Sequence, residues 1–245
     1  MKALILAAGF GTRLYPLTKN LPKTLLEIGN KTILERTLDN LFEANINEVF
    51  IVSNNKFFKI FEDWLKNYDK KDQIKLLNDG TNSNEERLGT IGDIKFVIDK
   101  ENIDDDFLVI CSDKIFEFSI SDFCKFFNEK KTVVNIGFDT QDIAKIRGKH
   151  GCIVLNDVQK ILEFQEKPEN PKSTVESIAF YIYPRESLEL FDKYLDDGNN
   201  PDAPGFFLEW LIKDKDAYCF LFKEKCYDIG NIESYKKANN VYKSR

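Results

Sequence analysis

Residues 6–23 decide the fold expected for this chain, and they read LAAGFGTRLYPLTKNLPK. The stretch begins inside an apolar run, residues 3–7 (ALILA), which predicts a short buried strand. The strand leads into Gly9-Phe10-Gly11, where glycine lets backbone N–H groups approach a phosphate because no Cβ stands in the way. Arg13 then offers a planar fork of donors, and Lys23 adds a point-like cation. A strand, a glycine turn and two cations together predict a binding loop for a polyphosphate.

Two well-known phosphate motifs do not describe this loop. A dinucleotide-binding G-x-G-x-x-G fingerprint needs glycine where the chain has Leu14, and a P-loop is excluded because no G-K-S or G-K-T occurs. A bare G-x-G is also compatible with an ordinary turn that carries solvated cations. The full string from Gly9 to Lys23, G-x-G-T-R-L-x-P-L-T-x-x-x-P-K, is far more specific than its two glycines.

The charge of the chain is uneven along its length. The 245 residues carry a formal net charge of -6, whereas residues 1–23 hold four basic side chains and no acidic one. The first 23 residues therefore carry +4 and the remainder -10. An acidic chain is a poor general partner for nucleic acid or an anionic membrane, so we expect neither. A single triphosphate held by one cationic loop is compatible with this distribution.

Composition indicates a globular protein of the reducing cytoplasm. Hydrophobic residues make up 42% and charged residues 31%, which excludes disordered and fibrous classes. No apolar run approaches the roughly 20 residues of a membrane span. The five cysteines include no C-x-x-C pair and predict reduced thiols, and His150 is the only histidine, which leaves little basis for a His-rich metal site. We therefore expect a cytoplasmic location.

Apolar strand-like runs alternate with helical patterns, which predicts an α/β fold. We expect one domain over 1–245, with a nucleotide-binding half over about 1–115 and a β-rich, acceptor-binding half over about 116–245. The central sheet is expected to be Rossmann-like, mixed but mainly parallel, with flanking helices. Strands are predicted over 3–7, 48–52, 74–77, 107–111, 132–138, 151–155, 160–165, 177–183 and 217–222, and helices over 33–44, 56–68, 89–98, 187–195, 206–211 and 232–242.

The loop string resembles the signature of the sugar-phosphate nucleotidyltransferases, which make activated metabolites from nucleoside triphosphates. The resemblance extends over nearly the whole chain, through Leu88-Gly89-Thr90-x-Gly92, Ser112-Asp113, Glu166-Lys167-Pro168 and Tyr227-Asp228-Ile229-Gly230. In length the chain is similar to the short, single-domain members. The resemblance implies that a phosphate oxygen of the acceptor attacks the α-phosphorus of the triphosphate and pyrophosphate leaves, with Mg²⁺ as cofactor.

The resemblance also implies a role for individual residues. Arg13, Lys23 and Asp113 are the expected catalytic residues, and Asp113 and Asp228 the expected Mg²⁺ ligands. An aspartate after a strand is also common as a turn or cap residue, and this alternative is stronger for Asp228. The expected nucleotide-binding residues are Leu6, Ala7, Ala8, Gly9, Gly11, Thr12, Arg13, Lys23 and Gly89, and the expected acceptor-binding residues are Lys114, Gly151, Glu166 and Lys167.

Three departures from the family pattern concern the acceptor. Lys114 stands where the family usually has Asn after the metal aspartate, Ala179 where it usually has Gly, and Asn231 where it usually has Thr. A sugar 1-phosphate with UTP or dTTP is the first expectation for the substrates. A CTP-dependent enzyme for a non-sugar phosphate, such as phosphocholine or phosphoglutamine, is the alternative, because short relatives have such activities. Either product is a precursor for surface polysaccharide (capsule) or other glycans.

Other classes of protein remain alternatives at this stage. A non-catalytic nucleotide sensor could keep the loop, although the presence of five charged site residues together argues against it, namely Arg13, Lys23, Asp113, Lys167 and Asp228. The sequence is compatible with a homo-oligomer and does not define one.

Overall fold

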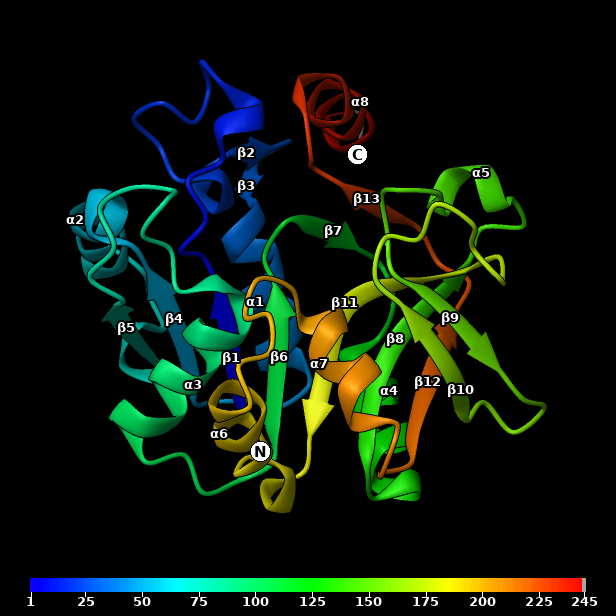
Figure 1. Cartoon of the computed structure of the whole chain (residues 1–245). Helices are drawn as coiled ribbons and strands as arrows, with labels where there is room; N and C mark the ends of the chain where they lie inside the picture. Colours follow the sequence, from blue (N-terminus) through cyan, green and yellow to red (C-terminus); the bar gives the residue numbers. More distant parts are fainter. Residues whose placement is uncertain (244–245) are drawn as a thin grey trace. The chain divides into compact units, whose positions relative to one another are not determined.

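The computed structural model describes residues 1–243 (Figure 1), which form two compact units. The first unit combines residues 1–87 and 111–120 with the chain from Glu224 onward, and the second combines residues 88–110 and 121–223. Both units are thus built from separate stretches of the chain. The single domain and the halves expected from the sequence stay a prediction.

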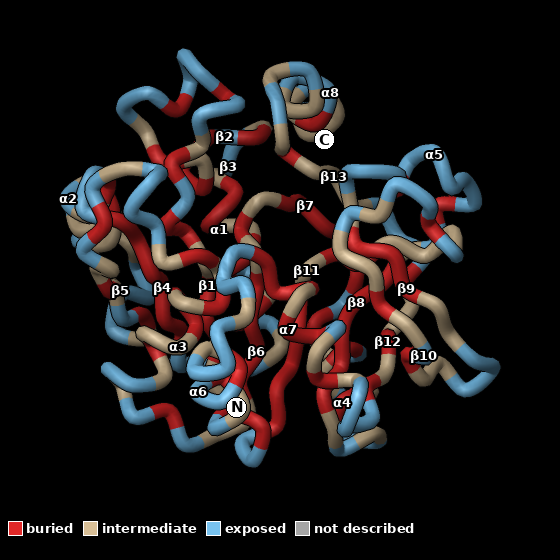
Figure 2. Tube along the Cα trace, viewed as in Figure 1, coloured by how far each residue is buried: buried red, intermediate tan, exposed pale blue. Residues whose placement is uncertain are grey.

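The first unit carries a parallel sheet in which β4 (Val49–Ser53) pairs with β1 (Lys2–Leu6) and β5 (Ile74–Asn78). Every residue of β4 is buried, as the continuous red segment in Figure 2 shows. A strand that is apolar on both faces needs cover on both sides, which is the situation of a parallel sheet in an α/β fold. The other elements of this unit are η1 (Thr12–Leu14), η2 (Lys23–Leu25), β2 (Glu27–Ile28), β3 (Lys31–Thr32), α1 (Ile33–Glu43), α2 (Asn55–Lys66), η3 (Lys71–Gln73), β7 (Lys114–Phe116), β13 (Cys226–Asp228) and α8 (Ile232–Lys243).

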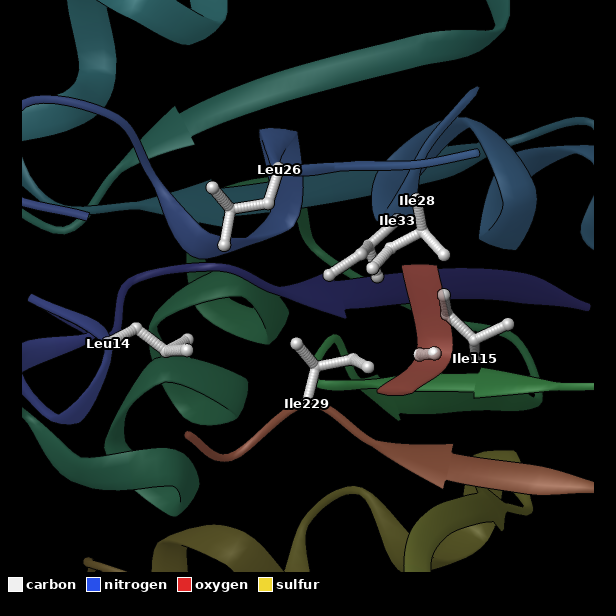
Figure 3. Close-up of a cluster of buried hydrophobic side chains, with 7 residues drawn as sticks. Leu14, Leu26, Ile28, Ile33, Ile115 and Ile229 are labelled. Atoms are coloured by element: carbon white, nitrogen blue, oxygen red, sulfur yellow. The ribbon is translucent and has the colours of Figure 1, made fainter. Parts of the chain in front are cut away.

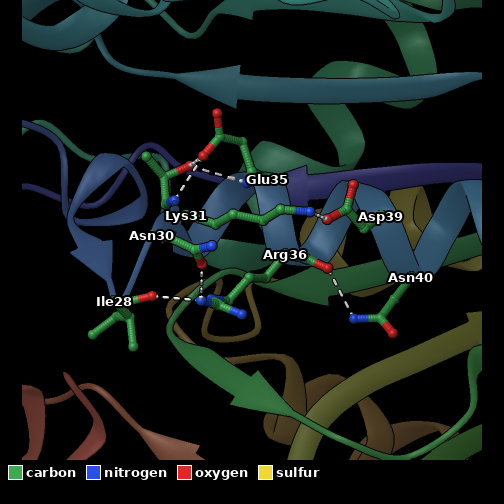
Figure 4. Close-up of polar contacts among 8 residues, drawn as sticks. Ile28, Asn30, Lys31, Glu35, Arg36, Asp39 and Asn40 are labelled. Carbon is green, nitrogen blue, oxygen red and sulfur yellow. Dashed lines mark hydrogen bonds and ion pairs between the residues drawn. The ribbon is translucent and has the colours of Figure 1, made fainter. Parts of the chain in front are cut away.

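Helix α1 begins at a complete capping box (Figure 4). The Thr32 hydroxyl accepts from the backbone N–H of Glu35 at 3.1 Å, and the Glu35 carboxylate accepts from the backbone N–H of Thr32 at 2.7 Å. One turn later, Arg36 donates to the carbonyl of Ile28 at 2.6 Å, so the helix also holds the short β2 strand. Since capping satisfies otherwise unpaired N–H groups, the start of α1 is set by its own sequence.

A hydrophobic cluster joins distant parts of the first unit (Figure 3). Leu14 follows the loop, Ile115 lies in β7, Ile229 follows β13 and Ala238 lies in α8. Each is at most 3% exposed. Burying such side chains contributes roughly 1.5–3 kcal/mol each for the larger ones. The cluster therefore connects the residue after the loop to β7, which directly follows Asp113, and to the segment after β13, which ends at Asp228. Its members are Leu14, Leu26, Ile28, Ile33, Ile115, Ile229 and Ala238.

The second unit has a mixed sheet around β8 (Val133–Asp139), which pairs antiparallel with β11 (Val175–Tyr183) and parallel with β12 (Ala217–Phe222). β11 also pairs antiparallel with β6 (Phe107–Cys111) and β9 (Cys152–Leu155). The remaining elements are α3 (Gly89–Glu101), α4 (Ile120–Lys130), α5 (Ile143–Ile146), β10 (Ile161–Gln165), η4 (Arg185–Ser187), α6 (Leu190–Asp196) and α7 (Pro204–Leu211).

The predicted strands over 151–155 and 160–165 correspond to β9 and β10, which form a hairpin, and Asn156 shapes its turn. The side-chain oxygen of Asn156 accepts from the backbone N–H groups of Val158 at 3.1 Å and Lys160 at 2.9 Å. Asparagine is common in turns because its side chain can hydrogen-bond to the backbone a few residues further along the chain. The two strands then pair antiparallel from Ile161 opposite Leu155.

The α/β class expected from the sequence is confirmed, and each predicted helix and strand has a counterpart within a few residues. Prediction missed the short strands β2, β3, β7 and β13, the short helix α5, and helix α4. Strands of two or three residues are too short to show an alternating pattern. Among the described residues, no helix is long and apolar enough to cross a membrane.

Candidate functional site

The glycine-rich loop follows β1 and is open where a ligand would approach. A Cβ placed on Gly9 would meet no atom within 4 Å. Gly11 has φ +63°, a left-handed conformation that favours glycine, and its carbonyl accepts from the buried Thr18 hydroxyl at 2.7 Å. Within residues 1–243, the N–H groups of Gly9, Phe10 and Gly11 donate to no protein acceptor. These features suit a loop that binds an anion through its backbone.

The base-pocket residues expected from the sequence lie at the end of β1. Ala7 and Ala8 are 5% and 8% exposed, and Leu6 is half-buried. The Ala8 carbonyl accepts from the side-chain amide of Asn54 at 2.7 Å, and the Leu6 carbonyl accepts from the hydroxyl of Ser112. Asn54 and Ser112 therefore position this segment of the chain.

The sequence analysis named Ser112 only as part of the Ser112-Asp113 motif, without a positioning role, and did not identify Asn54. Asn54 had a detectable signal, because an asparagine between a buried strand and a helix is a typical N-cap, and Asn54 does cap α2 by accepting from the N–H of Phe57 at 3.0 Å. Its second bond, to Ala8, spans 46 residues and has no local signature.

Five charged side chains of the first unit come together, and we call them the charged cluster: Arg13, Lys23, Asp113, Lys114 and Asp228. Lys23 lies 3.5 Å from the Asp113 carboxylate, and Lys114 lies 3.1 Å from that of Asp228. A backbone hydrogen bond also joins the two segments that carry the aspartates, since the N–H of Ile229 donates to the Asp113 carbonyl at 2.8 Å. The chain thus brings residues from positions 13 to 228 to one place.

The electrostatics of the charged cluster favour the charged forms of Asp113 and Lys114. Burial by itself would raise the pKa of Asp113, but the nearby Lys23, Lys114 and Arg13 lower it to about 2. Burial opposes the charged form of Lys114, yet Asp113 and Asp228 raise its pKa overall. Both groups therefore carry their charge at neutral pH.

The two aspartates fit a divalent metal of the magnesium type. The side chains of Asp113 and Asp228 are 35% and 39% exposed, and Asp228 Oδ1 is buried with no hydrogen-bond partner among the described residues. An unpartnered carboxylate oxygen is a suitable ligand for a hard cation. Within residues 1–243, no group of three or more His, Cys, Asp or Glu side chains is placed to hold a metal. Two protein ligands fit Mg²⁺, which keeps several waters and binds substrate phosphates.

Gly89, which was expected to contact the base, begins α3 in the second unit. It has φ +80°, and a Cβ there would lie 2.5 Å from the carbonyl oxygen of Pro201. The N–H of Ile91 donates to the same carbonyl at 2.9 Å. Glycine is therefore required here by close backbone packing, whatever role it has toward a base.

Three of the expected acceptor-binding residues lie in the second unit. A Cβ on Gly151 would lie 2.6 Å from the Phe164 ring, and a Cβ on Gly205 would lie 1.9 Å from a Glu166 carboxylate oxygen. The Glu166 side chain is 9% exposed and lies 3.7 Å from Lys167, which is half-exposed. Burial raises the pKa of Glu166, and this effect exceeds the lowering by the nearby Lys167 ammonium. The fourth, Lys114, belongs to the charged cluster of the first unit.

The strand position where the family usually has glycine adopts a glycine-like conformation. Ala179 has φ +59°, and the pairing of β11 with β8 shifts register between Ser177 and Tyr181. Its neighbours Ile178 and Phe180 are 2% and 0% exposed, so they are core residues of the second unit.

Comparisons with known proteins show the family of the chain. A family model of nucleotidyl transferases matches residues 2–245. The bifunctional protein GlmU of Methanocaldococcus jannaschii is 36% identical over 193 residues, which are 79% of this chain and 42% of that protein. Glucose-1-phosphate adenylyltransferase of Clostridium novyi is 30% identical over 254 residues, covering 98% of this chain and 66% of that protein.

A solved structure of UDP-glucose pyrophosphorylase complexed with UDP-glucose has a TM-score of 0.82 and 22% sequence identity, covering 100% of this chain and 99% of that chain. This likeness confirms the Rossmann-like α/β fold. The chain belongs to the nucleotidyl transferase family, as the loop motif predicted. It spans 42% and 66% of the length of the two curated relatives described above.

Proposed function

We propose that this chain transfers a nucleotidyl group from a nucleoside triphosphate to a phosphorylated small molecule and releases pyrophosphate. UTP, dTTP and CTP are the candidate donors, and a sugar 1-phosphate is the first candidate acceptor. The observation that carries the proposal is the charged cluster beside an open glycine-rich loop, in a chain of this family. Its product would serve surface polysaccharide or glycan synthesis in the cytoplasm.

The proposed chemistry assigns separate tasks to the residues of the first unit. The N–H groups from Gly9 to Arg13 hold the triphosphate, and the Arg13 guanidinium adds a bidentate contact. Lys23 neutralises charge that develops at the α-phosphate, and its ion pair with Asp113 orients the ammonium. Asp113 and Asp228 would hold Mg²⁺, which supplies charge neutralisation to the phosphates when bound. Catalysis then depends on position and charge, without a protein nucleophile.

The experiment that tests this proposal measures pyrophosphate release by the wild type and by Lys23→Ala and Asp113→Ala. Both variants are expected to lose turnover by roughly 100-fold or more while keeping the wild-type circular dichroism spectrum. Lys19→Ala is a matched control, since Lys19 is exposed, belongs to the same cationic segment and has no place in the charged cluster. Turnover at the wild-type rate in both Lys23→Ala and Asp113→Ala would contradict the proposed mechanism. Nucleotide binding without release of pyrophosphate from the nucleotide, whichever acceptor is supplied, would favour the sensor alternative.

The second candidate acceptor is a non-sugar phosphate with a cationic group, such as phosphocholine. The buried Glu166 carboxylate lies on a cavity of about 470 Å³ that is also lined by Glu163, Glu209 and Lys213. Lys172 lies 2.7 Å from Glu163 and Lys167 lies 3.7 Å from Glu166, which leaves the Glu209 carboxylate as the group that could meet a cationic acceptor such as phosphocholine. A panel of UTP, dTTP and CTP against hexose 1-phosphates and phosphocholine separates the two classes. Turnover confined to hexose 1-phosphates would exclude the non-sugar acceptor.

A further inference from the structure

Lys114 is held against one of the two expected metal ligands by strand pairing. β7 and β13 pair antiparallel with Lys114 directly opposite Asp228, so the two side chains share one face. Their ammonium and carboxylate lie 3.1 Å apart, and the Lys114 side chain is only 6% exposed. Cross-strand geometry therefore keeps a positive charge at Asp228.

The two oxygens of Asp228 differ in their surroundings. Oδ2 accepts from the Lys114 ammonium, whereas buried Oδ1 has no hydrogen-bond partner among residues 1–243. A divalent ion on Oδ1 would lie on the same carboxylate as an ammonium, a few ångströms from a like charge. Like charges at that distance repel strongly in a partly buried site.

We propose that Lys114 is a tethered cation that opposes the binding of a divalent metal at Asp228 while no nucleotide is bound. The inference rests on the proposed metal role of Asp113 and Asp228. The charged cluster has three cations and two carboxylates, so its side chains carry a net positive charge without a metal. A triphosphate brings several negative charges and reverses that balance. Metal binding is thereby made conditional on the nucleotide.

The test is a titration of the nucleotide-free protein with Mn²⁺ alone, followed by electron paramagnetic resonance of the free ion. Lys114→Met removes the charge and keeps a side chain of similar length, and it is expected to bind Mn²⁺ at least about tenfold more tightly than the wild type. Lys114→Arg keeps the charge and is expected to bind as weakly as the wild type. Lys160→Met breaks a lysine–aspartate pair, with Asp216 at 2.6 Å, outside the charged cluster and should leave Mn²⁺ affinity unchanged.

Two outcomes overturn the proposal. One is a Lys114→Met protein that is folded by circular dichroism and binds Mn²⁺ no more tightly than the wild type. The other outcome is read from the wild type alone: its affinity for Mn²⁺ would be the same without nucleotide as with UTP, dTTP or CTP present. Failure of the proposed function is a separate result, since it is read from pyrophosphate release.

Discussion

Replacing Asn54 tests how the first unit positions the start of the glycine-rich loop. Its side chain is fully buried and makes two bonds, one that caps α2 through the N–H of Phe57 and one that reaches the Ala8 carbonyl at 2.7 Å. Asn54→Ala removes both. Because Ala8 is an expected base-pocket residue, the same change should loosen nucleotide binding.

The size of the effect follows from these two bonds. Loss of an N-cap costs about 1 kcal/mol, and a buried carbonyl left without a donor costs about 1–3 kcal/mol. We therefore expect Asn54→Ala to lower the free energy of unfolding of the first unit by about 2–4 kcal/mol. Asn54→Ser keeps an oxygen that can cap α2 but cannot make both bonds, so its loss should be about 1–3 kcal/mol.

The assay uses the position of the two tryptophans. Trp64 lies in α2, the helix that Asn54 caps, and Trp210 lies in the second unit. In a Trp210→Phe background, urea unfolding followed by tryptophan fluorescence reports the first unit alone. Steady-state kinetics of pyrophosphate release in parallel should show a higher KM for the nucleotide with a smaller change in kcat.

Equal stability of wild type, Asn54→Ala and Asn54→Ser would refute the reasoning. A loss that is the same in both variants would mean that the cap contributes nothing and that the bond to Ala8 accounts for the whole effect.

Three further predictions concern the second unit. Gly89→Ala should destabilise it by at least about 2 kcal/mol in urea unfolding, because the new Cβ meets the Pro201 carbonyl at a positive φ, and an unchanged midpoint would contradict the close packing. Ala179→Gly should stabilise it by roughly 0.5–1 kcal/mol by relieving a positive φ, and a loss of stability would show that the methyl group packs usefully. Glu166→Gln should be more stable than the wild type near neutral pH, since burial raises the pKa of Glu166 and the folded state therefore favours the protonated acid. The wild type has the stabilising, protonated Glu166 at low pH and loses it as the pH rises through the raised pKa. The difference in free energy of unfolding between Glu166→Gln and the wild type should therefore disappear by about pH 4. A difference that does not change with pH would exclude the ionisation of Glu166 as its cause.

Local patterns in the sequence predicted the elements that depend on neighbouring residues. The run ALILA before Gly9, the apolar EVFIV run and the helical spacing of Phe57 and Phe61 each correspond to an observed strand or helix. The spacing of Ile120, Phe123 and Phe127 is also helical and matches α4, so that omission was avoidable. The loop motif was sufficient to predict the family.

The sequence by itself therefore determined the order of elements, the glycine-rich loop and the residues of the charged cluster as candidates. Only the tertiary structure decided that Lys114 faces Asp228, because the pair is set by strands of three residues separated by more than a hundred positions. It also decided that Gly89 packs on Pro201 and that Asn54 holds Ala8. Propensity and periodicity act over a few residues, whereas these contacts depend on which distant surfaces pack together, and a single sequence carries no local signal for that choice.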